Sequence, residues 1–278
     1  MKKRIALLAS ISMLTFSSCS SEGILCNVQA NAEDNVQIDA CEAVNFDFEA
    51  DVGSCKVSYG EENSAYVQLK YNAWGVNNDD AEDIISHISA DIYTKNNTIY
   101  IRFSEKESGM DFWKWIDKHK SMRSFSVDAD ITIPEHIKDF SIETDVGNII
   151  AENLCGKFDL SSDVGNVEAK NISIEKSSEF SSDVGNVSVS LSDAVAANSD
   201  VDISSDTGNA ELELSGKKED SSKISISSDV GDVSINLNGL DYENNSNKKS
   251  VVSEKNTITA DDNCEIKLST DVGKININ

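Results

Sequence analysis

Several common features are missing from the 278-residue sequence, which has one proline, three scattered histidines and neither a C-x-x-C nor a G-x-S-x-G motif. Without C-x-x-C, the sequence gives no support for a zinc site or a thioredoxin-like redox centre. Without G-x-S-x-G, it lacks the serine elbow of many hydrolases. The single proline, Pro134, favours a fold of hydrogen-bonded strands, because each proline removes a donor from a strand ladder.

Basic residues are scarce, with 24 lysines and arginines against 49 aspartates and glutamates and a formal net charge of −25. Such a surface repels nucleic acid and anionic lipid, so we expect no nucleic-acid partner. The charge suits cations or cationic partners, and it also serves solubility. Residues 145–240 contain only six lysines and no arginine. Because polysaccharide-cleaving enzymes need basic residues beside their carboxylates, we expect no enzyme.

Long apolar runs are absent except at the N-terminus, where three basic residues precede the twelve residues from Ile5 to Phe16. This run is typical of an export signal, because a spanning helix needs about 20 residues. The following "FSSC" resembles a bacterial lipobox, in which the cysteine, here Cys19, receives a diacylglycerol. An ordinary cleaved signal is the alternative. We expect a signal peptide over residues 1–18, a lipid-anchored linker over 19–35, and a mature chain outside the cytoplasm, anchored to the cell membrane or outer membrane.

The remaining five cysteines are an odd number: Cys26, Cys41, Cys55, Cys155 and Cys264. Export permits disulfides, and the first three cysteines are close enough in sequence for one pair among them. Spacing alone does not decide which cysteines pair.

A six-residue motif of the form "SSDVGN" recurs through the second half of the sequence, after a looser copy, "EADVGS", that contains Asp51. Its aspartate and glycine lie at Asp145 and Gly147, Asp163 and Gly165, Asp183 and Gly185, Asp206 and Gly208, Asp229 and Gly231, and Asp271 and Gly273. Successive motifs are 18 to 23 residues apart, except for a last interval of 42. A period near 20 residues is typical of solenoids, in which each repeat contributes one coil.

The segments around each motif alternate apolar and polar residues, which predicts strands with one buried face. The hydroxyl residue before each aspartate then points inward at a corner. Stacked repeats form ladders about 4.8 Å apart, with right-handed coiling as the default and an interior filled mainly by Val, Ile and Leu. We therefore predict an all-β, right-handed, single-chain β-solenoid. Its repeats cover residues 141–278 and continue from β coils with a helical insert in residues 36–140, whereas residues 240–262 fit either a degenerate coil or a long loop.

The motif allows two interpretations, a structural corner or a cation site. Glycine suits a tight turn, and the aspartate can accept a hydrogen bond from the backbone N–H two residues on. Calcium takes six to eight oxygen ligands, whereas one turn offers about two side-chain groups. Stacked carboxylates about 5 Å apart in water repel each other by only about 0.8 kcal/mol. We therefore expect corners without a metal or cofactor, with bound calcium as the open alternative.

One insert, "GMDFWKWIDKHKSMRS" at residues 109–124, combines aromatic and basic residues. Phe112, Trp113 and Trp115 are its candidate contacts for a sugar or a protein surface. An amphipathic turn could also rest on the membrane near the anchor. Alternatively, the aromatic residues cap the solenoid, because solenoid ends expose strand edges. Exposed tryptophans would favour binding, and buried ones would favour a scaffold.

The order of "AEDIISHISADIYTKNNTIYIRFSE", "VDADITIPEHIKDFSIETDVGNI" and the recurring "SSDVGNV" resembles the putative adhesin family, bacterial domains of unknown function often found on exported or membrane-attached proteins. The resemblance covers roughly residues 36–278. It implies a β-solenoid and an adhesive role, and it supplies no catalytic residues. The sequence thus favours a non-catalytic lipoprotein that binds an extracellular glycan or protein, with a structural or regulatory envelope scaffold as the alternative.

Overall fold

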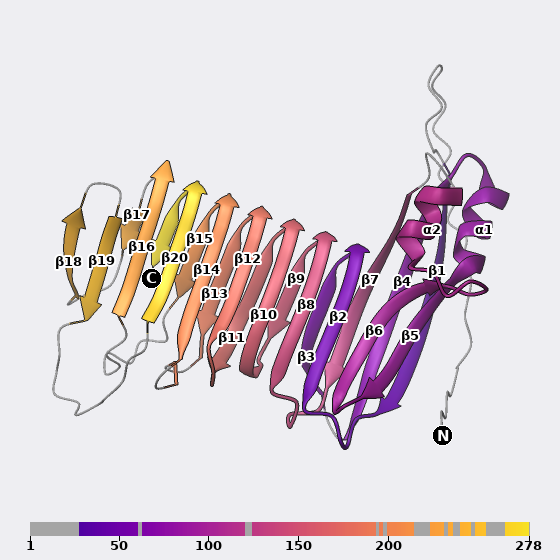
Figure 1. Ribbon diagram of the computed structural model, residues 1–278, viewed down its shortest axis with the longest axis horizontal. Helices are drawn as coiled ribbons and strands as arrows, with labels where there is room; N and C mark the ends of the chain where they lie inside the picture. The colour runs from indigo at the N-terminus through magenta and orange to yellow at the C-terminus, as the bar shows by residue number, and fades with distance from the viewer. Residues whose placement is uncertain are drawn as a thin grey trace, which may run out of the picture.

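The computed structural model describes residues 28–60, 63–119, 124–192, 195–196, 199–213, 223–230, 233–235, 240–245, 248–253 and 265–277. Cys19, Cys26, Gly231 and Cys264, for which the sequence makes predictions, lie outside the described residues. The described residues form 21 strands and two helices, α1 (Asn78–His87) and α2 (Phe112–His119). They build an elongated stack of coils with both helices at one end (Figure 1).

Sheet 1 runs along one side of the stack. In spatial order its strands are β5 (Ile88–Lys95), β6 (Thr98–Glu105), β2 (Asn45–Val52), β8 (Asp139–Val146), β10 (Cys155–Val164), β12 (Ser178–Val184), β14 (Asp200–Thr207), β20 (Glu265–Val272), β16 (Lys223–Val230), β19 (Lys248–Ser253) and β18 (Leu240–Asn245). All neighbours from β6 to β16 pair in parallel, whereas β5 and the β18–β19 hairpin add antiparallel strands at the two ends.

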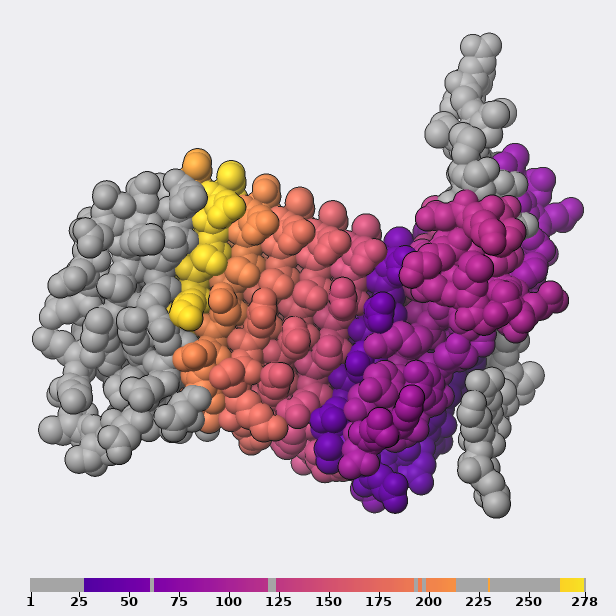
Figure 2. Space-filling view, in the orientation of Figure 1, coloured from indigo at the N-terminus to yellow at the C-terminus, as the bar shows by residue number. Residues whose placement is uncertain are grey.

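Sheet 2 forms the opposite side. In spatial order its strands are β1 (Val28–Asp39), β4 (Ser64–Gly75), β7 (Ser124–Ile133), β3 (Cys55–Tyr59), β9 (Ile149–Glu152), β11 (Val167–Ile174), β13 (Val187–Leu191), β15 (Ala210–Glu213), β21 (Ile275–Ile277) and β17 (Val233–Ile235). The pairs from β7 to β17 are parallel, while β1 and β4 pair antiparallel. The predicted β-solenoid is therefore confirmed, and its coils form regular ridges in the space-filling view (Figure 2).

The order of coils in space differs from the order in the sequence. The C-terminal coil, β20 and β21, lies between the coil of β14 and β15 and the coil of β16 and β17. The long last interval between motifs thus holds no additional coil among the described residues. Residues 240–253 instead contribute the β18–β19 hairpin, which pairs with the outer edge of β16. Covering this edge removes a row of unpaired backbone groups.

At the other end, β1 begins at Val28, inside the segment 19–35 that we expected to be a linker. This strand pairs with β4 over its whole length, although Ala32 is its only buried apolar residue before Ala40. Val36 and Ile38, on the same face as Ala32, are partly buried and pack against the core. The strand is therefore held by backbone pairing with a neighbour that is distant in sequence and by these apolar contacts.

The interior admits more aromatic side chains than the predicted aliphatic filling. Phe46, Phe140 and Phe158 occupy the same register position in β2, β8 and β10, and the rings of Phe140 and Phe158 stack at 5.1 Å. In β12 the small residue Ser178 occupies the equivalent position. The phenylalanine of this strand is instead Phe180, two residues further along, and its ring stacks diagonally on Phe158 at 5.8 Å. Large and small residues thus alternate to keep the core filled.

The helical insert predicted within residues 36–140 includes α1, which begins with an acidic first turn. Its N-cap residue, Asn77, accepts a hydrogen bond from the Asp80 backbone N–H at 2.9 Å. Ala81 and Ile84 are buried, whereas Ile88 already belongs to β5. No helix among the described residues is long and apolar enough to cross a membrane.

Candidate functional site

The repeated motif forms the corner between the two sheets, and its hydroxyl and glycine hold consecutive coils together. The Ser162 hydroxyl donates to the Gly147 carbonyl at 2.9 Å, and the Ser182 hydroxyl donates to the Gly165 carbonyl at 2.7 Å. The same bond recurs at Thr144, Ser205 and Thr270. All five hydroxyl side chains belong to buried residues, as the inward direction predicted.

The asparagine after the glycine forms a second ladder. The Asn148 side-chain carbonyl accepts from the Asn166 backbone N–H at 2.9 Å and from the Asn166 amide at 3.1 Å. Asn186 and Asn209 repeat both bonds, each to the asparagine one coil before it. These bonds satisfy backbone donors at the corner.

The aspartates of the motif do not make the backbone bond that we expected from an Asx-turn. Asp145, Asp163, Asp183, Asp206 and Asp271 are exposed, and no hydrogen bond or ion pair to their carboxylates occurs within the described part of the chain. The corner is stabilised instead by the neighbouring hydroxyl and asparagine. Within the described residues, no group of three or more His, Cys, Asp or Glu side chains is arranged to hold a metal ion.

The side chain after each aspartate lies outside the core at the same corner. Val146, Val164, Val184 and Val272 are 46–51% exposed, and they occupy equivalent register positions, with Thr207 at this position in the coil between Val184 and Val272. The corner edge therefore carries parallel rows of carboxylates and valines. Of Asp229, only the backbone position in β16 is described.

The aromatic insert does not form an exposed contact surface. Phe112 is fully buried in α2, and Trp113 and Trp115 are each only 8% exposed. Phe112 packs edge-on against Phe125 of β7 with ring centroids 4.7 Å apart, and Trp113 packs against Phe103 of β6 at 5.6 Å. The prediction that these three residues contact a ligand is therefore corrected. They were grouped by sequence proximity, whereas the strands opposite them decide their burial.

A small hollow of about 230 Å³ lies beside the start of α2. Its lining residues are Glu49, Asp51, Asp91, Arg102, Phe103, Ser104, Gly109, Asp111 and Trp113. Burial, with smaller contributions from Asp111 and Asp145, raises the pKa of Asp51 to about 6. The indole N–H of Trp113 is buried without a hydrogen-bond partner. The hollow thus collects negative charge at the junction between the insert and the first coil.

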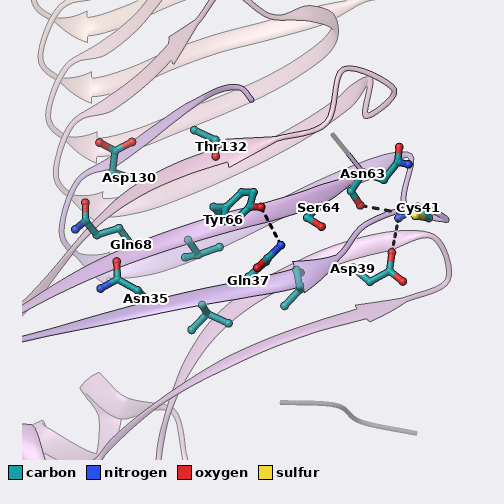
Figure 3. A pocket seen from close by; sticks show the side chains of 13 residues that line it. Asn35, Gln37, Asp39, Cys41, Asn63, Ser64, Tyr66, Gln68, Asp130 and Thr132 are labelled. Carbon is teal, nitrogen blue, oxygen red and sulfur yellow. Dashed lines mark hydrogen bonds between the residues drawn. The ribbon is translucent and has the colours of Figure 1, made fainter. Parts of the chain in front are cut away.

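A larger groove lies on the outer face of sheet 2, over β1, β4 and β7, and encloses about 850 Å³ (Figure 3). Its polar lining consists of Asn35, Gln37, Asp39, Cys41, Asn63, Ser64, Tyr66, Gln68, Asp130 and Thr132. Tyr66 is 43% exposed, and its hydroxyl accepts a hydrogen bond from the Gln37 amide at 2.9 Å. Sequence reasoning missed this groove, because only the pairing of three separate strands brings these side chains together.

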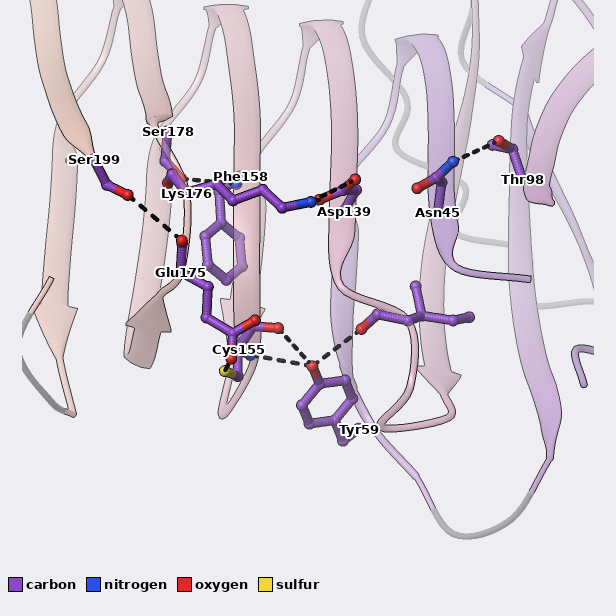
Figure 4. A network of polar contacts seen from close by, with 11 residues as sticks. Asn45, Tyr59, Thr98, Asp139, Cys155, Phe158, Glu175, Lys176, Ser178 and Ser199 are labelled. Atoms are coloured by element: carbon purple, nitrogen blue, oxygen red, sulfur yellow. Dashed lines mark hydrogen bonds and ion pairs between the residues drawn. The ribbon is translucent and has the colours of Figure 1, made fainter. Parts of the chain in front are cut away.

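A network of polar contacts at the opposite corner has a structural role (Figure 4). The Tyr59 hydroxyl donates to the Cys155 carbonyl at 2.8 Å and accepts from the Cys155 N–H at 3.2 Å. Lys176, just before β12, pairs with Asp139 of β8 at 3.2 Å across the intervening strand β10. Cys155 is a free thiol, as are Cys41 and Cys55, so none of the three described cysteines forms a disulfide.

The three histidines lie apart and serve local structure. His87 and His119 each place Nδ1 beside a backbone carbonyl four residues earlier, at 2.8 and 3.0 Å. His136 places Nε2 at 3.0 Å from the Ala40 carbonyl. None of them lines the groove or the acidic hollow.

One known protein family matches the repeat region in part. Residues 124–237 match the model of the family Toastrack DUF4097. This segment carries the Toastrack pattern. The Toastrack match covers the strands from β7 to β17, and it confirms, for these residues, the resemblance to a bacterial family of unknown function.

Two solved structures are similar to the chain. One is a putative cell adhesion protein from Clostridium sporogenes, with a TM-score of 0.47, and the other is a putative adhesin from Bacteroides fragilis, with a TM-score of 0.39. Each is 16% identical in sequence, and each alignment covers 88% of this chain and 97% of the other chain. A search of the curated proteins gave no match.

Proposed function

We propose that this protein is an exported lipoprotein, anchored through Cys19, whose β-solenoid binds an extracellular or cell-surface ligand without catalysing a reaction. The N-terminal signal and its lipobox-like cysteine support the location. The resemblance of residues 36–278 to the putative adhesin family supports an adhesive role. The ligand in this proposal is a glycan or a protein.

The observation that carries the proposal is the groove over β1, β4 and β7. A concave surface of about 850 Å³ has the size typical of ligand sites, and strands on a long solenoid hold it rigidly. Its polar groups, such as Gln37 and Gln68, project outward from strands whose other face is core. The groove lies at the helical end of the stack, where antiparallel strands replace the regular coils.

A non-catalytic role is supported by the chemistry of both concave surfaces. The groove contains no histidine and no lysine or arginine. In the acidic hollow, Arg102 is already held in ion pairs with Asp47 and with Glu49, the latter at 2.9 Å. Lyases and hydrolases need a base beside an available cationic group, whereas the groove offers no cation and the Arg102 guanidinium of the hollow is already paired with two carboxylates.

The proposal is tested with the full mature chain on an array of glycans and extracellular matrix proteins, in calcium and in chelator. Specific binding in both buffers would support a binding module. Binding lost only in chelator would show that a cation at the carboxylate rows takes part. An array without any specific signal would overturn the binding function.

The second candidate function, a structural scaffold of the envelope, is favoured by the burial of Trp113 and Trp115. Their burial makes α2 part of the wall that closes the helical end of the solenoid. A scaffold would retain envelope components from a membrane extract while giving no signal on the array. Capture of the same components by the chain with and without substitutions in the groove would then separate the two functions.

A further inference from the structure

We propose that the groove over β1, β4 and β7 binds an uncharged oligosaccharide. This inference rests on the proposed binding function and names the chemistry of its ligand. It depends on four properties of the groove: the order of its side chains, their hydrogen-bonding character, the exposed ring of Tyr66 and the length of the surface.

The groove floor consists of two rows that cross the three strands. Gln37, Tyr66 and Thr132 are register partners in β1, β4 and β7 and form one row. Asn35, Gln68 and Asp130 form the next row, two residues along each strand. Because alternate residues of a strand point to the same face, all six side chains project from one side of the sheet. Figure 3 shows them above the shared strand surface.

These side chains match the hydrogen-bonding pattern of sugar hydroxyls. A side-chain amide both donates and accepts, as a hydroxyl does, and Asn35, Gln37 and Gln68 supply three amides in adjacent positions. The Asp130 carboxylate adds an acceptor for two hydroxyls. The main groove contains no lysine or arginine, so the only charged groups that an anionic ligand would meet there are the carboxylates of Asp39 and Asp130. Neutral, hydroxyl-rich molecules are therefore favoured over phosphates, nucleic acids and acidic sugars.

Tyr66 supplies the apolar part of the site. Its ring is 43% exposed, and the hydrogen bond from Gln37 fixes the phenol at one end. An aromatic face that is held in place packs against the C–H face of a sugar ring at little cost in side-chain entropy. A protein partner would instead need an apolar pocket for an anchor residue. The apolar residues of the lining, Val36, Ile38 and Val67, pack against the core.

The surface is longer than one sugar ring. Beyond Gln68 and Asp130, the groove continues into a second hollow of about 170 Å³, where Lys56 and Lys70 lie beside Asp128 and Asp130 and Lys56 is already paired with Glu152 at 2.8 Å. From Ser64 to Lys70, β4 spans seven residues, and the six steps between them correspond to about 20 Å. A chain of several sugar units fits this length along the strand, so the ligand class is an oligosaccharide.

The test compares Tyr66→Ala with Tyr93→Ala, using the full-length chain in detergent on an array of neutral and acidic oligosaccharides and matrix proteins. Tyr93 is a matched control, because it is 40% exposed on β5 and lies outside the groove. We expect neutral oligosaccharides to bind the unchanged chain, an affinity loss of about 10-fold or more for Tyr66→Ala, and no loss for Tyr93→Ala. Gln68→Ala should weaken the same ligands, and equal melting temperatures would show that the variants are folded.

The outcomes separate this inference from the proposed function. Binding of matrix proteins alone would overturn the oligosaccharide site and leave the binding function standing. Neutral oligosaccharides that bind Tyr66→Ala and Gln68→Ala as tightly as the unchanged chain would place the site elsewhere and overturn the inference. A preference for acidic oligosaccharides would contradict its charge argument. A blank array would refute both proposals.

Discussion

Replacing Gly185 by alanine should destabilise the solenoid far more than an ordinary glycine substitution. A Cβ atom at this position would lie 1.8 Å from the Gly165 carbonyl oxygen and 2.5 Å from its carbon. Since real Cβ contacts do not fall below 3.0 Å, the two coils would have to separate locally by more than 1 Å. That movement would stretch the 2.7 Å bond from Ser182 to the same carbonyl.

The magnitude follows from two losses. Overpacking costs about 1–3 kcal/mol, and each buried polar group left without its partner costs about 1–3 kcal/mol. We therefore expect Gly185→Ala to lower the free energy of unfolding by about 3–5 kcal/mol. For a chain of this size, that corresponds to a fall in melting temperature of about 10 °C. Denaturant titration followed by circular dichroism measures the change.

Gly109→Ala is the matched control, because it separates crowding from backbone conformation. Gly109 has a φ of +65°, which disfavours alanine, yet a Cβ atom there would have nothing within 4 Å. Its cost should be about 1 kcal/mol, from the left-handed conformation alone. If both variants lost the same stability, the crowding argument for the column of corner glycines would be wrong.

Three further predictions concern stability. Ser182→Ala should lower the free energy of unfolding by about 1–2 kcal/mol, because it removes a buried hydrogen bond. Ser181→Ala, on the outer side of the same strand, should change it by less than about 0.5 kcal/mol, and thermal melts compare the two variants. The raised pKa of Asp51 means that the folded state holds this proton more tightly than the unfolded chain, so stability falls as pH rises from about 4 to about 6. Asp51→Asn should accordingly add about 1 kcal/mol at pH 7.5, after solvent screening, and nothing at pH 4; equal gains at both pH values would contradict this assignment. Trp113→Ala should lower the free energy of unfolding by about 3–5 kcal/mol, because it opens a cavity. Lys114→Ala, on the exposed side of the same helix, should lower it little, and denaturant titration distinguishes the two variants.

The acidic character of the chain has a defined place in the structure. The outward side chains of sheet 1 include Asp159, Glu179 and Asp202 in one register row, and the corner aspartates form another. On sheet 2, lysines neutralise some of the carboxylates: Lys170 pairs with Glu168 at 2.9 Å, and Lys56 pairs with Glu152 at 2.8 Å. The unpaired carboxylates of the described repeats therefore gather on sheet 1, on the side opposite the groove.

The corner motif shows how far local pattern carries. The alternation around "SSDVGN" predicted strands, an inward hydroxyl and a corner, and the buried Ser162 and Ser182 confirm the hydroxyl. Which atoms that hydroxyl contacts was beyond the pattern, because its acceptor, the glycine carbonyl, belongs to the preceding coil. The asparagine ladder was beyond the pattern for the same reason, because each asparagine oxygen accepts from a backbone N–H of the next coil.

The sequence by itself determined the β-solenoid, the period of its coils and the position of its corners. These properties repeat every 20 residues or so, and each repeat encodes them through short-range alternation and glycine placement. Tertiary structure alone decided the insertion of β20 between β14 and β16, the burial of Trp113 and Trp115, and the groove around Tyr66. All three depend on pairing between strands that are distant in sequence, and the register of such pairing is set by the whole core.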